Sequence, residues 1–191
     1  MTGEAATLRV IDVLEALAIP YMITGSFASN VYGVPRATGD ADFVVQLVDV
    51  SVRAIADALG DAFRLDPQMS FEAVTMTTRH VLQVAGTPFK IELFHLSDDA
   101  HDRERFQRRR RTSLSSRQPW LISPEDSIIT KLRWVSREKR SKDWDDIRDV
   151  VAVQGERIDW GYVYSWCDRH GTRSVLDEIR ASIPPINERP P

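Results

Sequence analysis

The pattern of apolar and polar positions divides the chain into a first part that mixes helices with strands and a second part made of helices. Apolar residues at helical spacing from Leu8 to Ile19 predict a first helix, which Pro20 ends. Further helices are expected over residues 27–33, 49–59 and 98–111, and strands over or near 21–24, 40–47, 62–65, 79–85, 88–95 and 112–122. Residues 124–138, 142–153, 159–169 and 173–182 read as helices. The order indicates an α+β fold, a mixed β-sheet flanked by helices and followed by a C-terminal helical half.

This order also predicts the domain organisation. Residues 1–122 are expected to form the core that carries the sheet, and residues 123–183 a helical region that completes a cleft. Residues 184–191 contain four prolines and are expected to be a disordered tail.

Composition limits the class of protein. The chain has 191 residues, of which 42% are hydrophobic and 28% charged, an ordinary balance for a globular domain. No apolar run approaches the roughly 20 residues that span a bilayer, and the N-terminus lacks the pattern of a secretory signal. Cys167 is the single cysteine, so an internal disulfide is impossible. We therefore expect a cytoplasmic protein without a membrane partner.

The net charge of −3 is unevenly distributed along the chain. Residues 101–142 hold thirteen basic and five acidic residues, a net charge of +8, which leaves −11 for the rest. Such a segment indicates contact with a polyanion, such as nucleotide phosphates or RNA. The alternative is an exposed, solvated helix face, and for the run Arg108–Arg111 the sequence favours this alternative.

Two aspartates one residue apart carry the strongest chemical signal. Asp40 and Asp42 lie in a predicted strand, where residues i and i+2 point to the same face. Two carboxylates held this close repel each other unless a cation lies between them. Oxygen ligands suit Mg²⁺, and Mg²⁺ suits a nucleoside triphosphate. The pair therefore predicts a metal site.

Two other segments complete this hypothesis. Glu92 lies between Ile91 and Leu93 in a predicted strand and would be a third metal ligand if that strand pairs with the aspartate strand. Gly25 and Ser26 follow an apolar strand and precede a helix, so backbone N–H groups and a hydroxyl could bind phosphate there. No Gly-x-x-x-x-Gly-Lys-Ser/Thr loop is present, which excludes a P-loop enzyme.

These motifs resemble those of the nucleotidyltransferase superfamily, in which an apolar-Gly-Ser turn precedes Asp-x-Asp and a third acid. Three segments resemble more narrowly the AbiEii-type branch, the toxin components of toxin–antitoxin systems. They are Pro35-Arg-Ala-Thr-Gly-Asp-Ala-Asp42, the helix from Pro124-Glu-Asp126 through Lys131, and Lys142-Asp-Trp-Asp-Asp-Ile147, where a lysine replaces the arginine of that branch. The resemblance spans roughly residues 20–150.

The resemblance implies a role for each matching residue. Asp40 and Asp42 would bind metal, with Glu92 as the third acid, and Ser26 in the Gly25–Ser26 turn would contact the triphosphate. Lys131 would contact a nucleotide phosphate. Asp143 would be an acid needed for activity, with Asp146 a weaker candidate and Asp145 weaker still. Arg36 and Thr38 are expected to shape the turn before the aspartates rather than to contact ligand.

The function implied is transfer of a nucleoside monophosphate from a triphosphate to an acceptor, with two Mg²⁺ ions expected as cofactors. The acceptor would be RNA, for example tRNA, for a toxin controlled by an antitoxin protein. One alternative is a small antibiotic-modifying nucleotidyltransferase acting on aminoglycosides or lincosamides. Another is a catalytically degenerate module that binds a nucleotide or a protein.

Overall fold

The computed structural model describes residues 1–138 and 141–184, and the predicted tail lies almost wholly outside them. The chain divides into two compact units. Unit 1 comprises residues 1–28 and 37–123, and unit 2 comprises residues 29–36 and the chain from Pro124 onward. Each unit is described separately below.

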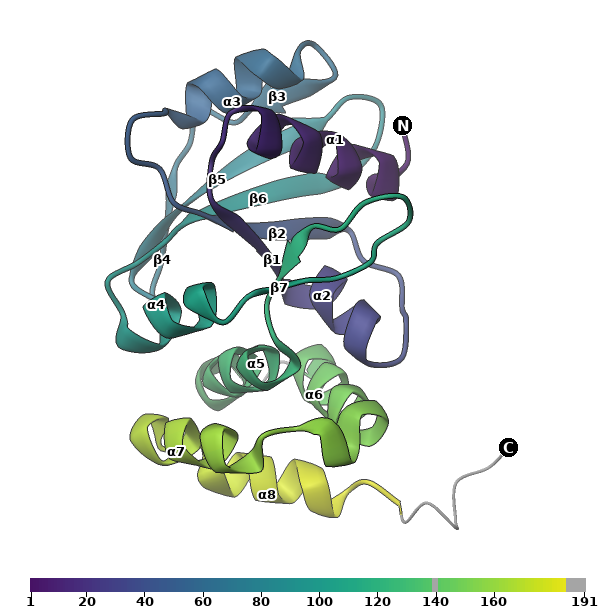
Figure 1. Ribbon diagram of the computed structural model, residues 1–191, viewed down its shortest axis with the longest axis vertical. Helices are drawn as coiled ribbons and strands as arrows, with labels where there is room; N and C mark the ends of the chain where they lie inside the picture. Colours follow the sequence, from purple (N-terminus) through teal and green to yellow (C-terminus); the bar gives the residue numbers. More distant parts are fainter. Residues whose placement is uncertain (139–140, 185–191) are drawn as a thin grey trace. The chain divides into compact units, whose positions relative to one another are not determined.

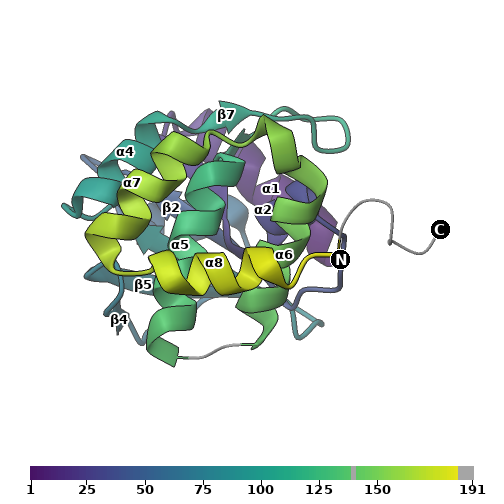
Figure 2. The ribbon, with the colours of Figure 1, turned by 90° about the horizontal axis from the view of Figure 1, so that it is seen from below.

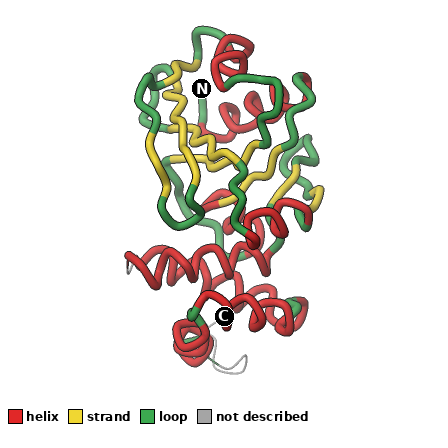
Figure 3. Tube along the Cα trace, turned by 90° about the vertical axis from the view of Figure 1, so that its left-hand side faces the viewer, coloured by secondary structure: helices red, strands yellow, loops and turns green. Residues whose placement is uncertain are grey.

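Unit 1 is built on a mixed sheet of short strands, drawn as yellow segments in Figure 3. The strands are β1 (Tyr21–Thr24), β2 (Asp40–Val45), β3 (Phe63–Leu65), β4 (Ser70–Glu72), β5 (Thr77–Val84), β6 (Lys90–His95), β7 (Arg110–Arg111) and β8 (Trp120–Leu121). Their order is β3-β5-β6-β2-β1-β8-β7, and β4 pairs with β5. The centre of the sheet is therefore β6, β2 and β1.

The pairing of the three central strands fixes which residues are neighbours. β2 and β6 run parallel, with Asp42 opposite Glu92, and β1 runs antiparallel to β2, with Thr24 opposite Asp42. The C-terminal end of β1 therefore lies beside the N-terminal half of β2. Since Gly25 directly follows Thr24, the turn after β1 lies next to the aspartate pair.

Helices α1 (Gly3–Ala16) and α3 (Val52–Leu59) pack against each other on one side of this sheet (Figure 1). Thr2 and Ser51 cap their N-termini by accepting hydrogen bonds from backbone N–H groups three residues later. The core contains Tyr21, Ile23 and Phe43, each at most 1% exposed. The other helices that begin in unit 1 are α2 (Gly25–Tyr32), which runs on into unit 2, and α4 (Ala100–Gln107).

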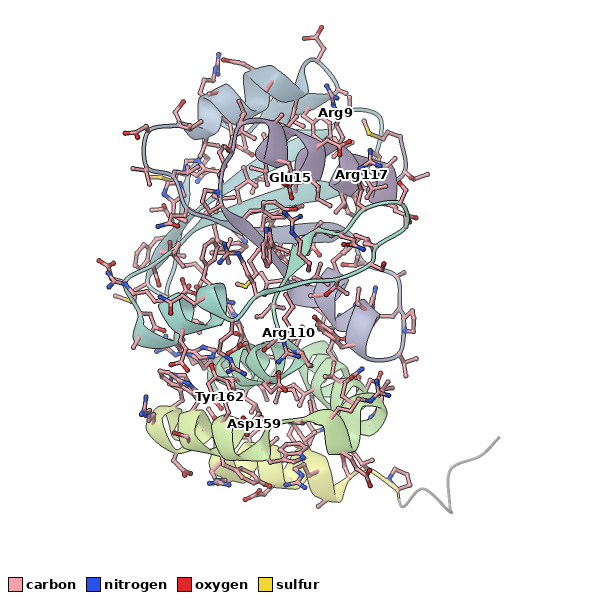
Figure 4. All side chains as sticks on the ribbon, viewed as in Figure 1. Arg9, Glu15, Arg110, Arg117, Asp159 and Tyr162 are labelled. Carbon is pink, nitrogen blue, oxygen red and sulfur yellow. The ribbon has the colours of Figure 1, made fainter. Side chains whose placement is uncertain are left out.

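Unit 2 is a helical bundle of α5 (Pro124–Glu138), α6 (Ser141–Gln154), α7 (Trp160–His170) and α8 (Arg173–Ala181), with a short 3₁₀ turn at Gly155–Arg157. Figure 2 shows α8 crossing the other helices, with which it packs. Asp159 caps α7 by accepting a hydrogen bond from the backbone N–H of Tyr162, and both are labelled in Figure 4. The core of this bundle is formed by the apolar faces of all four helices.

The predicted fold class is confirmed, and most predicted elements lie within a few residues of the observed ones. The strand predicted near 112–122 is wrong in extent, because only β8 lies within it and residues 112–119 form a loop between β7 and β8, which pair with each other. The helix predicted over 27–33 begins earlier, because α2 starts at Gly25. No helix within the described residues is long and apolar enough to cross a membrane.

Candidate active site

The predicted acids of unit 1 share one face of the sheet. Asp40 and Asp42 are two residues apart on β2, and Glu92 is the direct strand partner of Asp42. Partners in neighbouring strands point to the same side, and neighbouring strands lie about 4.8 Å apart. The pairing required by the three-acid hypothesis is therefore present in the fold. The roles of the acids as metal ligands stay a prediction.

Thr38 orients the first of these acids. Its hydroxyl donates a hydrogen bond to Asp40 Oδ1 at 2.9 Å, which restricts the rotation of the carboxylate. A threonine two residues before the acid can make this contact because both side chains lie on the same side of an extended chain. The threonine of the sequence pattern thus contacts the first acid directly, and its role in shaping the turn rather than contacting ligand stays a prediction.

Gly25 allows the second acid to lie against the turn. Its φ of 65° is in the left-handed region, which glycine adopts without strain. A Cβ atom at this position would lie 1.8 Å from Asp42 Oδ2, so the carboxylate occupies the space that any other residue would need. The glycine therefore permits close approach of Asp42 to the N-terminal turn of α2. Ser26 lies in the same turn, where backbone N–H groups favour anions.

Glu92 has a partner that the sequence pattern did not indicate. Arg79 Nη1 on β5 donates to Glu92 Oε2 at 3.0 Å, and Arg79 Nε donates to Ser70 Oγ on β4 at 2.9 Å. The guanidinium therefore bridges the edge of the sheet to the third acid. The signal that could have indicated Arg79 is its position in β5. Val81 pairs with Glu92, and Arg79, two residues before Val81, lies on the same face of the sheet as Glu92.

The donor set can be compared with the needs of a divalent cation. Asp40, Asp42 and Glu92 offer only carboxylate oxygens, which Mg²⁺ prefers, and each carboxylate can accept about four hydrogen bonds or ligand contacts. As the side chains stand, no group of three or more histidine, cysteine, aspartate or glutamate residues in the described part of the chain is arranged to hold a metal. The two aspartates fit a cation in chemistry and spacing, whereas Glu92 is engaged with Arg79.

The predicted residues of unit 2 form a separate buried cluster. Lys131 Nζ on α5 donates to Asp143 Oδ1 at 2.9 Å and to Asp146 Oδ2 at 2.8 Å on α6. All three side chains are at most 10% exposed. An ammonium group has three donors, so two are used by carboxylates and one remains for another acceptor. In the predicted contact of Lys131 with a nucleotide phosphate, the third donor would make the hydrogen bond.

Asp146 has a larger part in this cluster than the sequence suggested. Arg36 Nε and Nη2 donate to its two oxygens at 2.6 and 2.8 Å, a bidentate pair. Burial would raise the pKa of Asp146, but the hydrogen bond from Arg36 and the charge of Lys131 outweigh it and hold the pKa below its ordinary value. Arg36 and Asp146 are 110 positions apart in the sequence, which explains why local pattern did not reveal the contact.

Part of the basic segment is paired with acids inside unit 1. Arg111 Nη1 donates to Glu15 Oε1 at 2.6 Å and Arg117 Nε donates to Asp12 Oδ1 at 2.8 Å, so the loop between β7 and β8 is held to α1. Figure 4 labels one member of each pair, Glu15 and Arg117. Arg105 is buried against Asp102 on α4. Arg111 and Arg117 are therefore neutralised by acids that lie outside the basic segment.

Comparison with known proteins supports the fold. No family model matches the chain, and no curated protein sequence matches it. The solution structure of the antibiotic-resistance factor ANT(2'')-Ia is similar with a TM-score of 0.59 at 13% identity, covering 93% of this chain and 96% of that one. The crystal structure of ANT(2'')-Ia in complex with adenylyl-2''-tobramycin gives 0.60 at 13% identity, covering 91% and 99%.

The crystal structure of JHP933 from Helicobacter pylori is also similar, with a TM-score of 0.55 at 14% identity, covering 92% of this chain and 75% of that one. At these identities the likeness concerns the fold. The fold is nucleotidyltransferase-like, a mixed sheet with a helical C-terminal half. The narrower resemblance to AbiEii-type toxins stays a prediction.

We expect Gly25→Ala to lower the free energy of unfolding by about 1–3 kcal/mol, because alanine must adopt a left-handed backbone and displace the Asp42 carboxylate. The matched control is Gly39→Ala, where a Cβ would meet no atom within 4 Å. The control should change stability by less than about 0.5 kcal/mol. Chemical denaturation of both variants measures the difference. Equal stability of the two would contradict the close approach.

We expect Asp146→Ala to destabilise the protein by about 3–5 kcal/mol, because Lys131 then remains buried with only one of its two carboxylate partners. Asp145→Ala is the control, since this neighbour is 51% exposed and its one ion-pair partner among the described residues is Arg148. Its cost should stay below about 1 kcal/mol. Thermal unfolding followed by circular dichroism compares the two, and a cost for Asp146→Ala no larger than for the control would remove Asp146 from the cluster.

Proposed function

We propose that the chain is a magnesium-dependent nucleotidyltransferase that transfers a nucleoside monophosphate from a nucleoside triphosphate to an acceptor hydroxyl. The observation that supports this most is the pairing of β2 with β6, which brings Asp42 and Glu92 to one face beside Gly25. A nucleotide-transfer site needs carboxylates for the metal and a backbone turn for phosphate, and both lie at this end of the sheet.

Each residue would have a distinct task. Asp40 and Asp42, with Glu92 as the third ligand, would hold Mg²⁺, which supplies charge neutralisation on the triphosphate. Ser26 and the first N–H groups of α2 would bind phosphate oxygens. Glu92 would accept the proton of the acceptor hydroxyl as the acceptor oxygen bonds to the α-phosphorus. The bond from that phosphorus to the bridging oxygen breaks, and pyrophosphate leaves.

Residues of unit 2 would assist through charge. Lys131 would direct its third donor to a nucleotide phosphate, and Asp143 and Asp146 would hold its ammonium group in place. In this interpretation the two aspartates position the lysine rather than contact substrate. A cytoplasmic enzyme would fit the single cysteine, Cys167, which is buried.

For the acceptor we favour a small cationic molecule, such as an aminoglycoside or a lincosamide. The similar protein ANT(2'')-Ia is an antibiotic-resistance factor, and the likeness covers nearly the whole length of both chains. One of its structures contains adenylyl-2''-tobramycin. In addition, the pairing of Arg111 and Arg117 with acids of α1 weakens the argument for a polyanionic acceptor.

The second candidate is an RNA acceptor such as tRNA, for a toxin held in check by an antitoxin. The net charge of +8 over residues 101–142 favours it. Incubation with each α-³²P-labelled triphosphate and Mg²⁺ in the presence of total bacterial RNA or a panel of these antibiotics separates the two. Label on RNA supports the toxin, and label on an antibiotic supports the modifying enzyme. Label on neither, in any mixture, contradicts the proposed function.

We expect Asp42→Asn to reduce label transfer at least about 1,000-fold, because it removes a charged ligand needed for the metal. The fold should persist, since asparagine has the same shape. Asp49→Asn is the control, an equal charge change at an exposed position outside the strand. The control should retain full transfer. Transfer by Asp42→Asn at the rate of the control would defeat the mechanism.

We expect Arg79→Gln to tighten Mn²⁺ binding about three- to tenfold, because the guanidinium competes with a cation for Glu92. Mn²⁺ is a paramagnetic substitute for Mg²⁺, and its binding can be measured directly by electron paramagnetic resonance. Arg64→Gln on β3 is the control for charge alone, since its side chain is exposed. If both variants bind Mn²⁺ equally, Glu92 is not a metal ligand.

A further inference from the structure

A cavity of unit 1 lies at the end of β2 that is opposite the two aspartates. It has a volume of about 520 Å³ and is lined where β2 and β6 end, by Val45–Leu47 and His95–Asp98, and by residues of α4 and the turn after it. Cavities of about 300–1,000 Å³ bind small ligands. The C-terminal edges of parallel strands are places where α/β proteins bind ligands. Asp40, Asp42 and Glu92 do not line this cavity.

Arg109 is the charged group that distinguishes this cavity. Its guanidinium stacks over Phe106 at 4.1 Å and lies 5.0 Å from the ring of Trp120, and Nη1 donates to the carbonyl oxygen of Phe106. Its Nε is enclosed and has no hydrogen-bond partner in the described chain. Burial and the nearby charge of Arg111 lower the pKa of Arg109. The protein thus holds a cation here at an energetic cost.

A comparison with Arg111 shows what Arg109 lacks. Both guanidinium groups lie over Trp120, but Arg111 has a carboxylate partner, Glu15. Within the described residues, no acid pairs with Arg109. The aromatic rings offset part of the cost of burying this cation, and an anion that approaches it would offset more. The cavity gives such an anion access.

The other polar groups of the cavity are compatible with an anion. His95 also lines it, and its Nε2 is enclosed without a partner in the described chain. Its ring stacks on His80, and burial lowers its pKa. Asp98 is the one acid in the lining, and its exposed carboxylate is paired with Arg103. The charge offered to a ligand is therefore that of Arg109.

Apolar residues form the rest of the wall. Val45, Leu47, Leu96 and Phe106 line the same cavity, so a ligand must have an apolar body as well as an anionic group. Inorganic phosphate alone would leave this surface in contact with water. The lining thus selects an organic anion rather than a simple ion.

We propose that this cavity binds a small organic oxyanion, whose carboxylate or phosphate group meets Arg109 and His95 while its apolar body contacts Val45, Leu47 and Leu96. The site is separate from the site proposed for nucleotide transfer and does not depend on that function. Carboxylate and phosphate share the geometry that a guanidinium recognises.

Isothermal titration calorimetry of the full chain tests the proposal, with phenyl phosphate, benzoate, inorganic phosphate and neutral benzyl alcohol as probes. EDTA is present throughout, and Asp42→Asn is titrated in parallel to exclude binding at the aspartate site. We expect phenyl phosphate or benzoate to bind, with binding unchanged in Asp42→Asn. Benzyl alcohol and inorganic phosphate should bind at least tenfold more weakly. Either aromatic anion supports the site and identifies the preferred group.

Arg109→Gln should weaken the aromatic anion at least tenfold, while Arg64→Gln, an equal charge change outside the cavity, should leave it unchanged. If Arg109→Gln unfolds, His95→Phe keeps an aromatic ring against His80 and should weaken binding by a similar factor. Absence of binding by both aromatic anions overturns the proposal. Equal binding by the two arginine variants, or by inorganic phosphate and phenyl phosphate, overturns it as well.

Discussion

The parallel pairing of β2 with β6 is the constraint on which the candidate active site depends. Ala41 and Phe43 on β2 and Ile91 and Leu93 on β6 are all fully buried, and they alternate with the acids along the two strands. A slip of one residue in either strand would bury carboxylates and expose apolar side chains. The hydrophobic core of unit 1 therefore fixes the register, and the register places Asp42 beside Glu92.

In unit 2 one carboxylate has a comparable role. Asp146 accepts hydrogen bonds from Arg36 and Lys131, so two cations share it inside a helical bundle. Breaking such a buried network costs more than the network contributes, because a charge is left without compensation. The network therefore defines the geometry of the cluster more than it stabilises the fold. It also anchors the segment 29–36 to α6, which turns a loop residue, Arg36, into part of the bundle.

Local pattern was sufficient to predict most elements and the face shared by the acids. Alternating apolar residues indicated β2 and β6, and Pro124 marked the start of α5. Contacts set by tertiary structure were not predictable. Arg79 approaches Glu92 only through the pairing of β5 with β6, and Arg36 meets Asp146 across 110 residues. Sequence could place each carboxylate on an element, but not the cation that pairs with it.

The difference between neighbours in sequence and neighbours in space also bears on the proposed acceptor. Counted along the chain, the charges of residues 101–142 predict a surface that binds a polyanion. In space, Arg111 and Arg117 pair with Glu15 and Asp12, which belong to the acidic remainder. The two charges of an ion pair largely cancel each other's field at a distance. Salt screens what remains beyond about 10 Å at ordinary ionic strength. The acid face of β2 and β6 carries three carboxylates against one paired arginine, Arg79. Mg²⁺ held by these carboxylates would neutralise much of that charge. The spatial pairing of Arg111 and Arg117 is therefore a better guide to the proposed acceptor than the count along the chain, and it weakens the argument for a polyanion.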